Sequence, residues 1–228
     1  MPQTNDDLEA GYGPSIETSP NRVLDDVTTV RGGGVIDGAN SRDATQSNPV
    51  YLGAGMPLGR LTSGGRYAPS VIGLGEAYTS GGTTLTTTPA AAAELVRRIG
   101  LTGTFNLKGI VSGAVASNQV TYSAVNTTTG AITITNIGVT YAADSWIQPE
   151  DGSETVVTIY NGSNEGFPQR MTREVDGTDV NTRLPVAIAA LVIEANVTFW
   201  PAAGVFRTAL RTELNSFGNF QFQEQYVG

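Results

Sequence analysis

The sequence has no cysteine and no histidine among its 228 residues. The absence of cysteine excludes disulfides, thiolate metal sites and cysteine nucleophiles. The absence of histidine excludes Ser-His triads, histidine-ligated metals and the side chain that most often serves as a general base near neutral pH. Lysine occurs once, at Lys108, so catalysis would have to rest on carboxylates, tyrosines, hydroxyl groups or Lys108. We therefore expect no enzyme, no metal site and no cofactor.

Positive charge and long apolar runs are also scarce. The formal net charge is −8, and six acidic residues against one arginine give residues 1–30 a charge of −5. Without basic clusters, such a chain is expected to bind no nucleic acid directly. The longest apolar run, residues 186–193, is far too short to span a bilayer, and the opening MPQTNDDLEA has no features of a secretory signal. We expect no membrane partner either.

The amino-terminal region differs in composition from the rest. Residues 1–48 are poor in large apolar side chains and rich in Gly, Pro, Asn, Asp and Ser. This composition predicts an extended arm that is loose when unbound. Within it, Val27-Thr28-Thr29-Val30 is the only good strand former, so it is the segment expected to pair with a partner.

Local signals predict a hairpin and then a helix. Residues 52–69 contain two short apolar strands around Ser63-Gly64-Gly65, which can take the positive φ of a tight turn. The helix is predicted over residues 90–99, with Thr88 as the N-cap, Pro89 in the first turn and Gly100 as the stop. Further strands are predicted at residues 104–109, 119–125 and 131–137.

The carboxy-terminal part combines strands with a second helix. Strands are predicted at residues 155–160, 185–193 and 219–227, and the middle one is apolar on both faces, as a central strand is. Trp200-Pro201 is predicted to open a helix with one apolar stripe, which consists of Phe206, Leu210, Leu214 and Phe217. The sequence thus predicts a mainly β fold with two short helices.

The order of four segments carries a resemblance. LGRLTSGGRYAP, DGSETVVTIYNG, a Val/Ile/Ala-rich strand and TFWPAAGVFRTALRTELNSFG follow one another as in the head decoration proteins of tailed bacteriophages, the family typified by the lambda decoration protein. The resemblance covers residues 49–72 and 151–222, somewhat under half of the chain. It implies an α+β decoration core with a β-tulip-like fold. The chain departs from the family in a longer arm and in about 75 additional residues, 73–149.

This resemblance implies a domain organisation and a function. Residues 1–48 would be a capsid-binding arm, residues 49–72 and 150–228 the decoration core, and residues 73–149 an inserted β-rich module that faces outward. The protein would be made in the host cytoplasm and would bind the outer surface of the mature capsid. It would bind the major capsid protein as a homotrimer, at three-fold and quasi-three-fold positions, and stabilise the shell.

Two sets of residues are the candidate contacts. Val27, Thr28, Thr29, Val30 and Arg31 are expected to add a strand to an exposed edge of the capsid protein, by main-chain hydrogen bonds. By the resemblance, Trp200 and Pro201 correspond to the family's carboxy-terminal Trp-Pro. We expect them at the trimer interface, where Trp200 is either a core anchor or a subunit anchor.

Other groups favour ordinary structural roles. The carboxylates of Asp144, Glu150, Asp151 and Glu154 fit no metal-loop spacing and indicate a solvated turn. Glu94, Arg97 and Arg98 are expected on an exposed helix face.

Two alternative functions remain open. The Thr-rich module would be an adhesive or glycan-binding domain if its aromatic residues lay on the surface; these are Tyr78, Phe105, Tyr122, Tyr141 and Trp146. A tail-tube subunit would also need β-strands and oligomerisation, and a ring or tube in solution would favour it.

Overall fold

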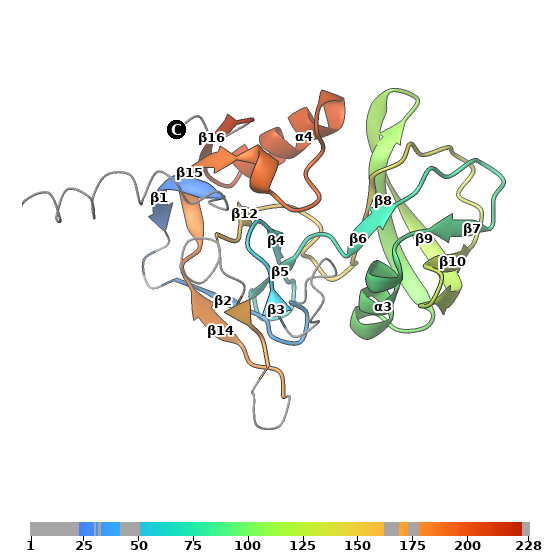
Figure 1. The fold of residues 1–228 in the computed structure, drawn as a ribbon, viewed down its shortest axis with the longest axis horizontal. Coiled ribbons are helices and arrows are strands. Elements are labelled where there is room, and N and C mark those ends of the chain that lie inside the picture. Colours follow the sequence, from blue (N-terminus) through green and yellow to red (C-terminus); the bar gives the residue numbers. More distant parts are fainter. Residues whose placement is uncertain are drawn as a thin grey trace, which may run out of the picture.

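The structure, a computed structural model, describes residues 23–29, 31, 33–41, 51–161, 169–172 and 178–224. In these residues the fold is mainly β with two α-helices, as the sequence predicts. Two bodies lie side by side in Figure 1: the green strands with helix α3 on one side, and the blue and orange strands with helix α4 on the other.

The first body is a six-stranded antiparallel sheet whose strands all come from residues 73–148. Their order is β6-β11-β8-β9-β10-β7. The strands are β6 (Gly73–Gly75), β7 (Thr84–Thr86), β8 (Gly103–Val111), β9 (Ala114–Asn126), β10 (Ala131–Ile134) and β11 (Ser145–Gln148). The two end strands meet, because Gly75 bridges to Thr87 and the Glu76 N–H donates to the Thr86 carbonyl at 2.8 Å. We call this body the closed sheet.

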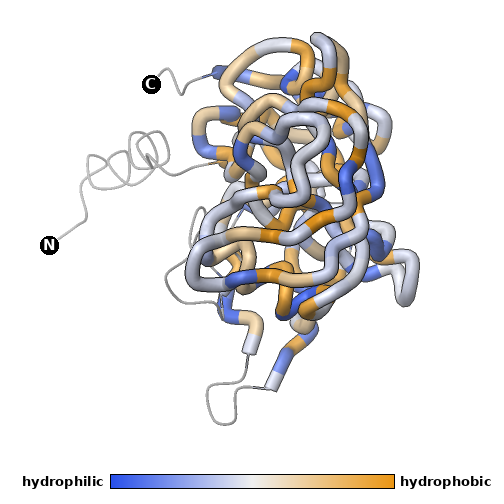
Figure 2. The backbone as a smooth tube through the Cα atoms, turned by 90° about the vertical axis from the view of Figure 1, so that its right-hand side faces the viewer, coloured by the Kyte–Doolittle hydropathy of each residue, from blue (hydrophilic) through white to orange (hydrophobic). Residues whose placement is uncertain are grey.

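The interior of the closed sheet is filled by one apolar cluster, and the part of its outer face that meets solvent is polar. Alternation along β9 buries Val120 and Tyr122 while Gln119 and Thr121 face solvent. In Figure 2 this body faces the viewer, and its tube is mostly pale with short orange stretches. Helix α3 (Pro89–Arg98) packs against this sheet through Leu95. Its predicted N-cap is confirmed, because the Thr88 hydroxyl accepts from the Ala91 N–H at 3.1 Å.

The second body contains a three-stranded sheet with the order β1-β15-β16. Strand β15 (Ala187–Ile193) is central, as its apolar sequence predicts; it pairs antiparallel with β1 (Leu24–Thr29) and parallel with β16 (Asn219–Gln223). In the described residues, neither β1 nor β16 has a second strand neighbour. We call this body's three strands the open sheet.

The remaining strands form two further sheets in the second body. A five-stranded sheet has the order β12-β4-β5-β2-β14, and a two-stranded sheet joins β13 to β3. Their bounds are β2 (Gly34–Ile36), β3 (Tyr51–Leu52), β4 (Pro57–Arg60), β5 (Tyr67–Pro69), β12 (Thr158–Ile159), β13 (Gln169–Arg170) and β14 (Thr182–Leu184). The predicted hairpin is confirmed as β4 and β5, which pair antiparallel around Gly64 and Gly65, both at positive φ.

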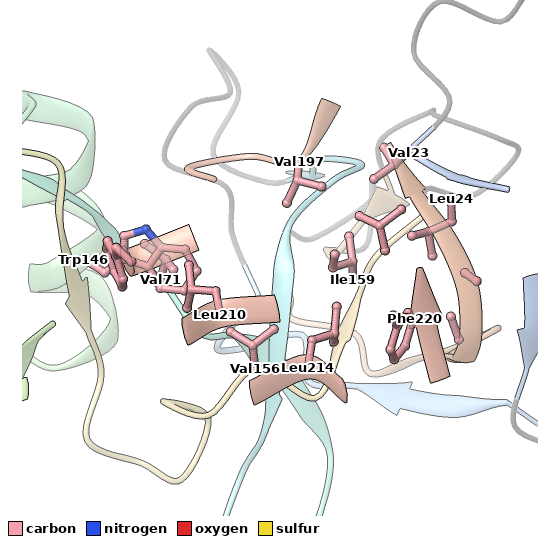
Figure 3. Packing of buried hydrophobic residues seen from close by; sticks show 14 residues of the cluster. Val23, Leu24, Val71, Trp146, Val156, Ile159, Val197, Leu210, Leu214 and Phe220 are labelled. Atoms are coloured by element: carbon pink, nitrogen blue, oxygen red, sulfur yellow. The ribbon is translucent and has the colours of Figure 1, made fainter. Parts of the chain in front are cut away.

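A shared core joins the two bodies. Trp146, in β11 of the closed sheet, is fully buried in the same cluster as Val71, Val156 and Leu210 (Figure 3). Its indole N–H donates to the Phe199 carbonyl at 2.9 Å, and its ring meets Phe206 edge-on with centroids 5.5 Å apart. The closed sheet is therefore packed against the second body.

Several predicted elements have different bounds. Helix α4 (Gly204–Asn215) begins three residues after Pro201, because a 3-10 turn, η1 (Glu194–Asn196), and an extended Ala203 precede it. The predicted strand at 155–160 is reduced to β12, because the Val156 N–H donates to the Glu213 carboxylate and not to a carbonyl of a neighbouring strand. Strands β8 and β9 are longer than predicted and β10 is shorter. Phe217 leaves the apolar stripe of α4 and is 55% exposed, because the helix ends before it.

The prediction of a loose arm over residues 1–48 is wrong for the part that the structure describes. Leu24 is fully buried, and β1 pairs with β15. Strand β2 lies between β5 and β14 in the five-stranded sheet. The low apolar content of the region gave no signal for these strands, because Val23, Leu24 and Ile36 are its few large apolar side chains that enter a core built mainly by other segments. Residues 1–22 and 42–48 lie outside the described residues.

Candidate interaction surfaces

The predicted capsid-binding segment lies on β1, at an edge of the open sheet. Val27, Thr28 and Thr29 are exposed, and so is Arg31, which follows the strand; Val30 lies outside the described residues. The segment already has one strand neighbour, β15, within its own chain. It can therefore offer only its other edge to a partner strand.

That other edge is restricted at its start. The Leu24 N–H donates to the Asn161 side-chain oxygen at 3.0 Å, so a side chain occupies this donor. The pairing of β1 with β15 also shifts register between Asp25 and Thr28 and again between Thr28 and Thr29. Bulges and side-chain caps are devices that limit uncontrolled edge pairing. Among the residues that the structure describes, the part of the edge left for a partner is thus short and centred on residues 27–29.

The predicted trimer contact has an intrachain role in the structure. The Trp200 indole N–H donates to Glu194 at 2.7 Å, and its ring stacks on Phe222, with the planes 16° apart. Trp200 also approaches Trp146, with ring centroids 6.3 Å apart. The trimer contact itself stays a prediction for Trp200 and Pro201.

A pocket of about 350 Å³ lies beside Trp200 and Pro201, with Glu194, Arg207 and Glu224 in its wall. Glu194 is buried and accepts hydrogen bonds from Arg211 and from Trp200. Burial alone would raise the pKa of Glu194, but these hydrogen bonds and the charges of Arg211 and Arg207 outweigh burial and hold the pKa below its ordinary value. The charged groups of this pocket are thus already paired with one another, and Arg207 also binds Glu224 at 2.6 Å.

The carboxylates near residue 150 do not form a metal site. Asp151 accepts from Arg98, Glu150 accepts from Thr104 and Gln119, and Glu154 accepts from the Gly152 N–H. Throughout the described part of the chain, no three Asp or Glu side chains converge as metal ligands would. The turn interpretation holds for Glu150 and Glu154, but Asp151 has a structural role.

The prediction that Glu94 and Arg98 lie on an exposed helix face is wrong. Glu94 is buried, and the Arg98 side chain is 2% exposed. Arg98 donates to Asp151 at 2.8 Å, to the Pro69 carbonyl at 2.7 Å and to the Ser153 hydroxyl at 2.7 Å. It therefore joins the segment that leads into the closed sheet to the segment that leaves it. Burial lowers the pKa of Arg98, partly offset by Asp151.

The aromatic residues of the closed sheet are not on its surface. Tyr78, Phe105, Tyr122, Tyr141 and Trp146 are all at most 2% exposed. The three tyrosine hydroxyls donate to backbone carbonyls: those of Tyr78, Tyr122 and Tyr141 reach Gly82, Gly100 and Leu107. Burial raises the pKa of Tyr122 and of Tyr141. None of the five side chains is available as a stacking platform for a sugar.

A surface patch that the sequence did not predict lies at one end of the open sheet. Ile188 and Phe217 are 43% and 55% exposed, and both line a pocket of about 170 Å³. The wall also contains Arg60, Tyr67, Val157 and Val186. The patch could not be predicted from the sequence, because helical spacing places Phe217 in the apolar stripe of α4 and therefore in the core.

Neither α3 nor α4 has the length and apolar composition of a membrane-spanning helix, and they are the α-helices of the described residues. Comparisons of the chain with protein-family models, with curated proteins and with solved structures found no match.

Proposed function

We propose that this chain is a structural virion protein that binds the outer surface of a mature phage capsid as a homotrimer and stabilises the shell. Its partner is the major capsid protein. The function needs no reacting group, because a protein that binds only the mature lattice stabilises it by mass action. The gain is about 2.7 kcal/mol per site at a free concentration one hundred times the dissociation constant.

One observation carries the proposal. The two stretches that resemble decoration proteins are separated by about 75 residues, yet they pack together. Strand β12 pairs with β4, with Thr158 opposite Leu58, and the Val157 N–H donates to the Leu58 carbonyl at 2.9 Å. Leu58, Tyr160 and Leu184 share one apolar cluster. The segments that carry the resemblance thus form neighbouring parts of one body.

The free edge of β1 supplies a means of attachment. An extended segment of the capsid protein can pair with residues 27–29, and main-chain hydrogen bonds then give affinity without a deep pocket. The acidic residues 1–26 favour a basic capsid surface. Three such edges on one trimer act together, so contacts that are individually weak give tight attachment.

The test is co-sedimentation of the purified protein with expanded, mature capsids and with immature capsids. We expect binding to mature capsids at micromolar concentration and little binding to immature ones. Absence of binding to mature capsids at that concentration would contradict the proposal.

A pair of variants separates attachment from folding. Val27→Glu with Thr29→Glu places charge on the exposed edge, while Thr121→Glu with Thr133→Glu places the same charge on exposed positions of the closed sheet. Only the first pair is expected to reduce binding. Removal of residues 1–22 is a further test, and it should stop there because Val23 and Leu24 are buried in the core.

A tail-tube subunit is a second candidate. It is favoured by the two outer edges of the open sheet, which have no strand neighbour within the described residues, because strand pairing between copies can build a ring. Electron microscopy of the purified protein distinguishes the two functions. Rings that stack into tubes would support the second candidate, and discrete trimers would support the first.

A further inference from the structure

We propose that the patch formed by Ile188, Phe217 and their pocket is the contact between copies of this chain, with Phe217 of one copy seated in the pocket of the next. This inference rests on the proposed homotrimer and names the surface that holds it together. It assigns the contact to the end of the open sheet rather than to Trp200 and Pro201.

Exposure of large apolar side chains narrows the choice of surface. Among the described residues, five large apolar side chains are exposed: Val27, Leu101, Ile188, Val205 and Phe217. Leu101 and Val205 line none of the pockets described above, whereas Ile188 and Phe217 line the same one. The backbone at Gly218, next to Phe217, passes close to the backbone of Ile188: a Cβ on Gly218 would lie 2.4 Å from the Ile188 carbonyl oxygen. Adjacent exposed apolar groups around a hollow are typical of protein contact sites.

The pocket has the size and lining for a phenyl ring. Its volume is about 170 Å³, and Tyr67, Val157 and Val186 supply apolar walls. A cavity of about 150 Å³ lined by apolar side chains admits benzene. The side chain of Phe217 from a second copy therefore fits the space, and aromatic side chains that fill such pockets dominate the energetics of protein contacts.

Charge favours a second copy as the occupant. Arg60 lies in the pocket wall, and within the described residues it forms no ion pair; its Nε donates to the Gly65 carbonyl at 3.0 Å. The chain as a whole carries a formal charge of −8. An unpaired guanidinium in the contact therefore attracts a copy that has an excess of carboxylates, and it offsets part of the repulsion between like-charged subunits.

Geometry agrees with a closed ring of subunits. Phe217 forms part of the wall of the pocket in its own chain, so the projecting side chain and the pocket are adjacent. In a ring, the projecting group of one subunit meets the pocket of the next only if both lie close to the rotation axis. The end of the open sheet would thus surround the three-fold axis.

Trp200 is less suited to this role. Its N–H is bonded to Glu194, and its ring packs on Phe222 and Trp146 within the chain. The charged groups in its pocket also pair with each other, because Arg207 binds both Glu194 and Glu224. Ile188 and Phe217 have no comparable task inside the fold.

The experiment is multi-angle light scattering after size-exclusion chromatography, on the full chain at about 50 µM. We expect the wild type to be a trimer. Phe217→Ser and Arg60→Glu should each yield mainly monomer, with Phe217→Ser weakening association at least about thirtyfold, as loss of a central contact residue does. Leu101→Ser and Val205→Ser are matched controls at exposed apolar positions, and both should remain trimers.

Several results would overturn the inference. A monomeric wild type at this concentration would do so, and so would a Phe217→Ser variant that stays trimeric. Dissociation by Val205→Ser alone would also do so, because it would assign the contact to the Trp200 side. Circular dichroism verifies folding of each variant. If Phe217→Ser does not fold, Arg60→Glu decides, because Arg60 is exposed. A trimer that depends on Phe217 but does not sediment with capsids would sustain this contact and refute the capsid function; a monomer that sediments would do the reverse.

Discussion

The closed sheet and the open sheet differ in what happens to the backbone hydrogen-bonding groups of their outermost strands. Every strand of the closed sheet has a neighbour on each side, because β6 and β7 meet through Gly75 and Thr87. The open sheet leaves one edge of β1 and one edge of β16 without a strand neighbour in the described residues. The closed sheet also buries its aromatic residues, whereas Ile188 and Phe217 stay exposed at the end of the open sheet. Groups able to pair with another chain thus gather in the open sheet.

The two bodies nevertheless share a core at Trp146, and its removal is expected to have the largest effect on stability. Trp146→Ala should lower the free energy of unfolding by about 3–5 kcal/mol, because it deletes a fully buried ring and its hydrogen bond to Phe199. Guanidinium unfolding monitored by circular dichroism measures this value. Two separate transitions, only one of which shifts, would show that the bodies are independent. Leu101→Ala is the control and should change stability by less than about 0.5 kcal/mol.

Arg98 joins the same bodies by polar contacts. Arg98→Ala should destabilise the protein by about 2–4 kcal/mol, because a buried hydrogen-bonded cation is lost and Asp151 loses its partner. Amide hydrogen exchange should quicken at residues 69–73 and 148–153. Arg97→Ala, one position earlier on α3, should cost about 1 kcal/mol or less, since the Arg97 side chain is 30% exposed. Equal losses in both variants would argue against the linking role of Arg98.

Closure of the six-stranded sheet can be tested with two glycines. Gly130 and Gly113 both have positive φ, 77° and 82°. A Cβ on Gly130 would lie 1.9 Å from the Thr87 carbonyl oxygen, next to the closing bridge, whereas a Cβ on Gly113 would meet nothing within 4 Å. Gly113→Ala should cost about 1 kcal/mol, the price of the left-handed backbone alone, and Gly130→Ala at least about 2 kcal/mol. Similar melting temperatures for the two variants would mean that Gly130 tolerates a side chain and that closure is not tight there.

The Glu194 cluster provides a smaller, pH-dependent effect in the second body. Because the pKa of Glu194 is held below its ordinary value of 4.5 in the folded chain, its contribution is fully present above that pH and is lost as pH falls through the folded pKa. Glu194→Gln should lower stability by about 1–2 kcal/mol at pH 7. The difference from wild type should shrink below about pH 4.5. Urea unfolding at pH 7 and pH 3 measures it, and a constant difference would contradict the assignment.

The sequence predicts the features that depend on neighbours along the chain. Thr88, Pro89 and Gly100 define α3, and Gly64 and Gly65 define the turn between β4 and β5, because caps and tight turns need particular residues at fixed positions. Closure of the six-stranded sheet escapes such reasoning, since Gly75 and Thr87 carry no signal that they will meet. Arg98 escapes it as well: its partners Pro69 and Asp151 lie 29 and 53 residues away, so only the helix pattern was available, and that pattern suggested a solvated face.

The candidate contacts also divide into features that depend on neighbours along the chain, which the sequence predicts, and features that depend on distant residues, which it does not. The strand tendency of residues 27–29 was visible in the sequence, and β1 confirms that they form a strand. Pairing of β1 with β15 was not visible, because the partner lies about 160 residues away. Phe217 and Ile188 become neighbours only when α4 ends early and the chain turns back along β15.

Closure of the six-stranded sheet has a consequence for crowding. A protein repeated at many nearby positions experiences a very high local concentration of its own surface, and an unpaired strand on an outward face would then invite aggregation. The polar outer face of β9 and the absence of a free end strand remove that hazard from the larger sheet. This body can therefore be packed densely beside its own copies and remain dispersed.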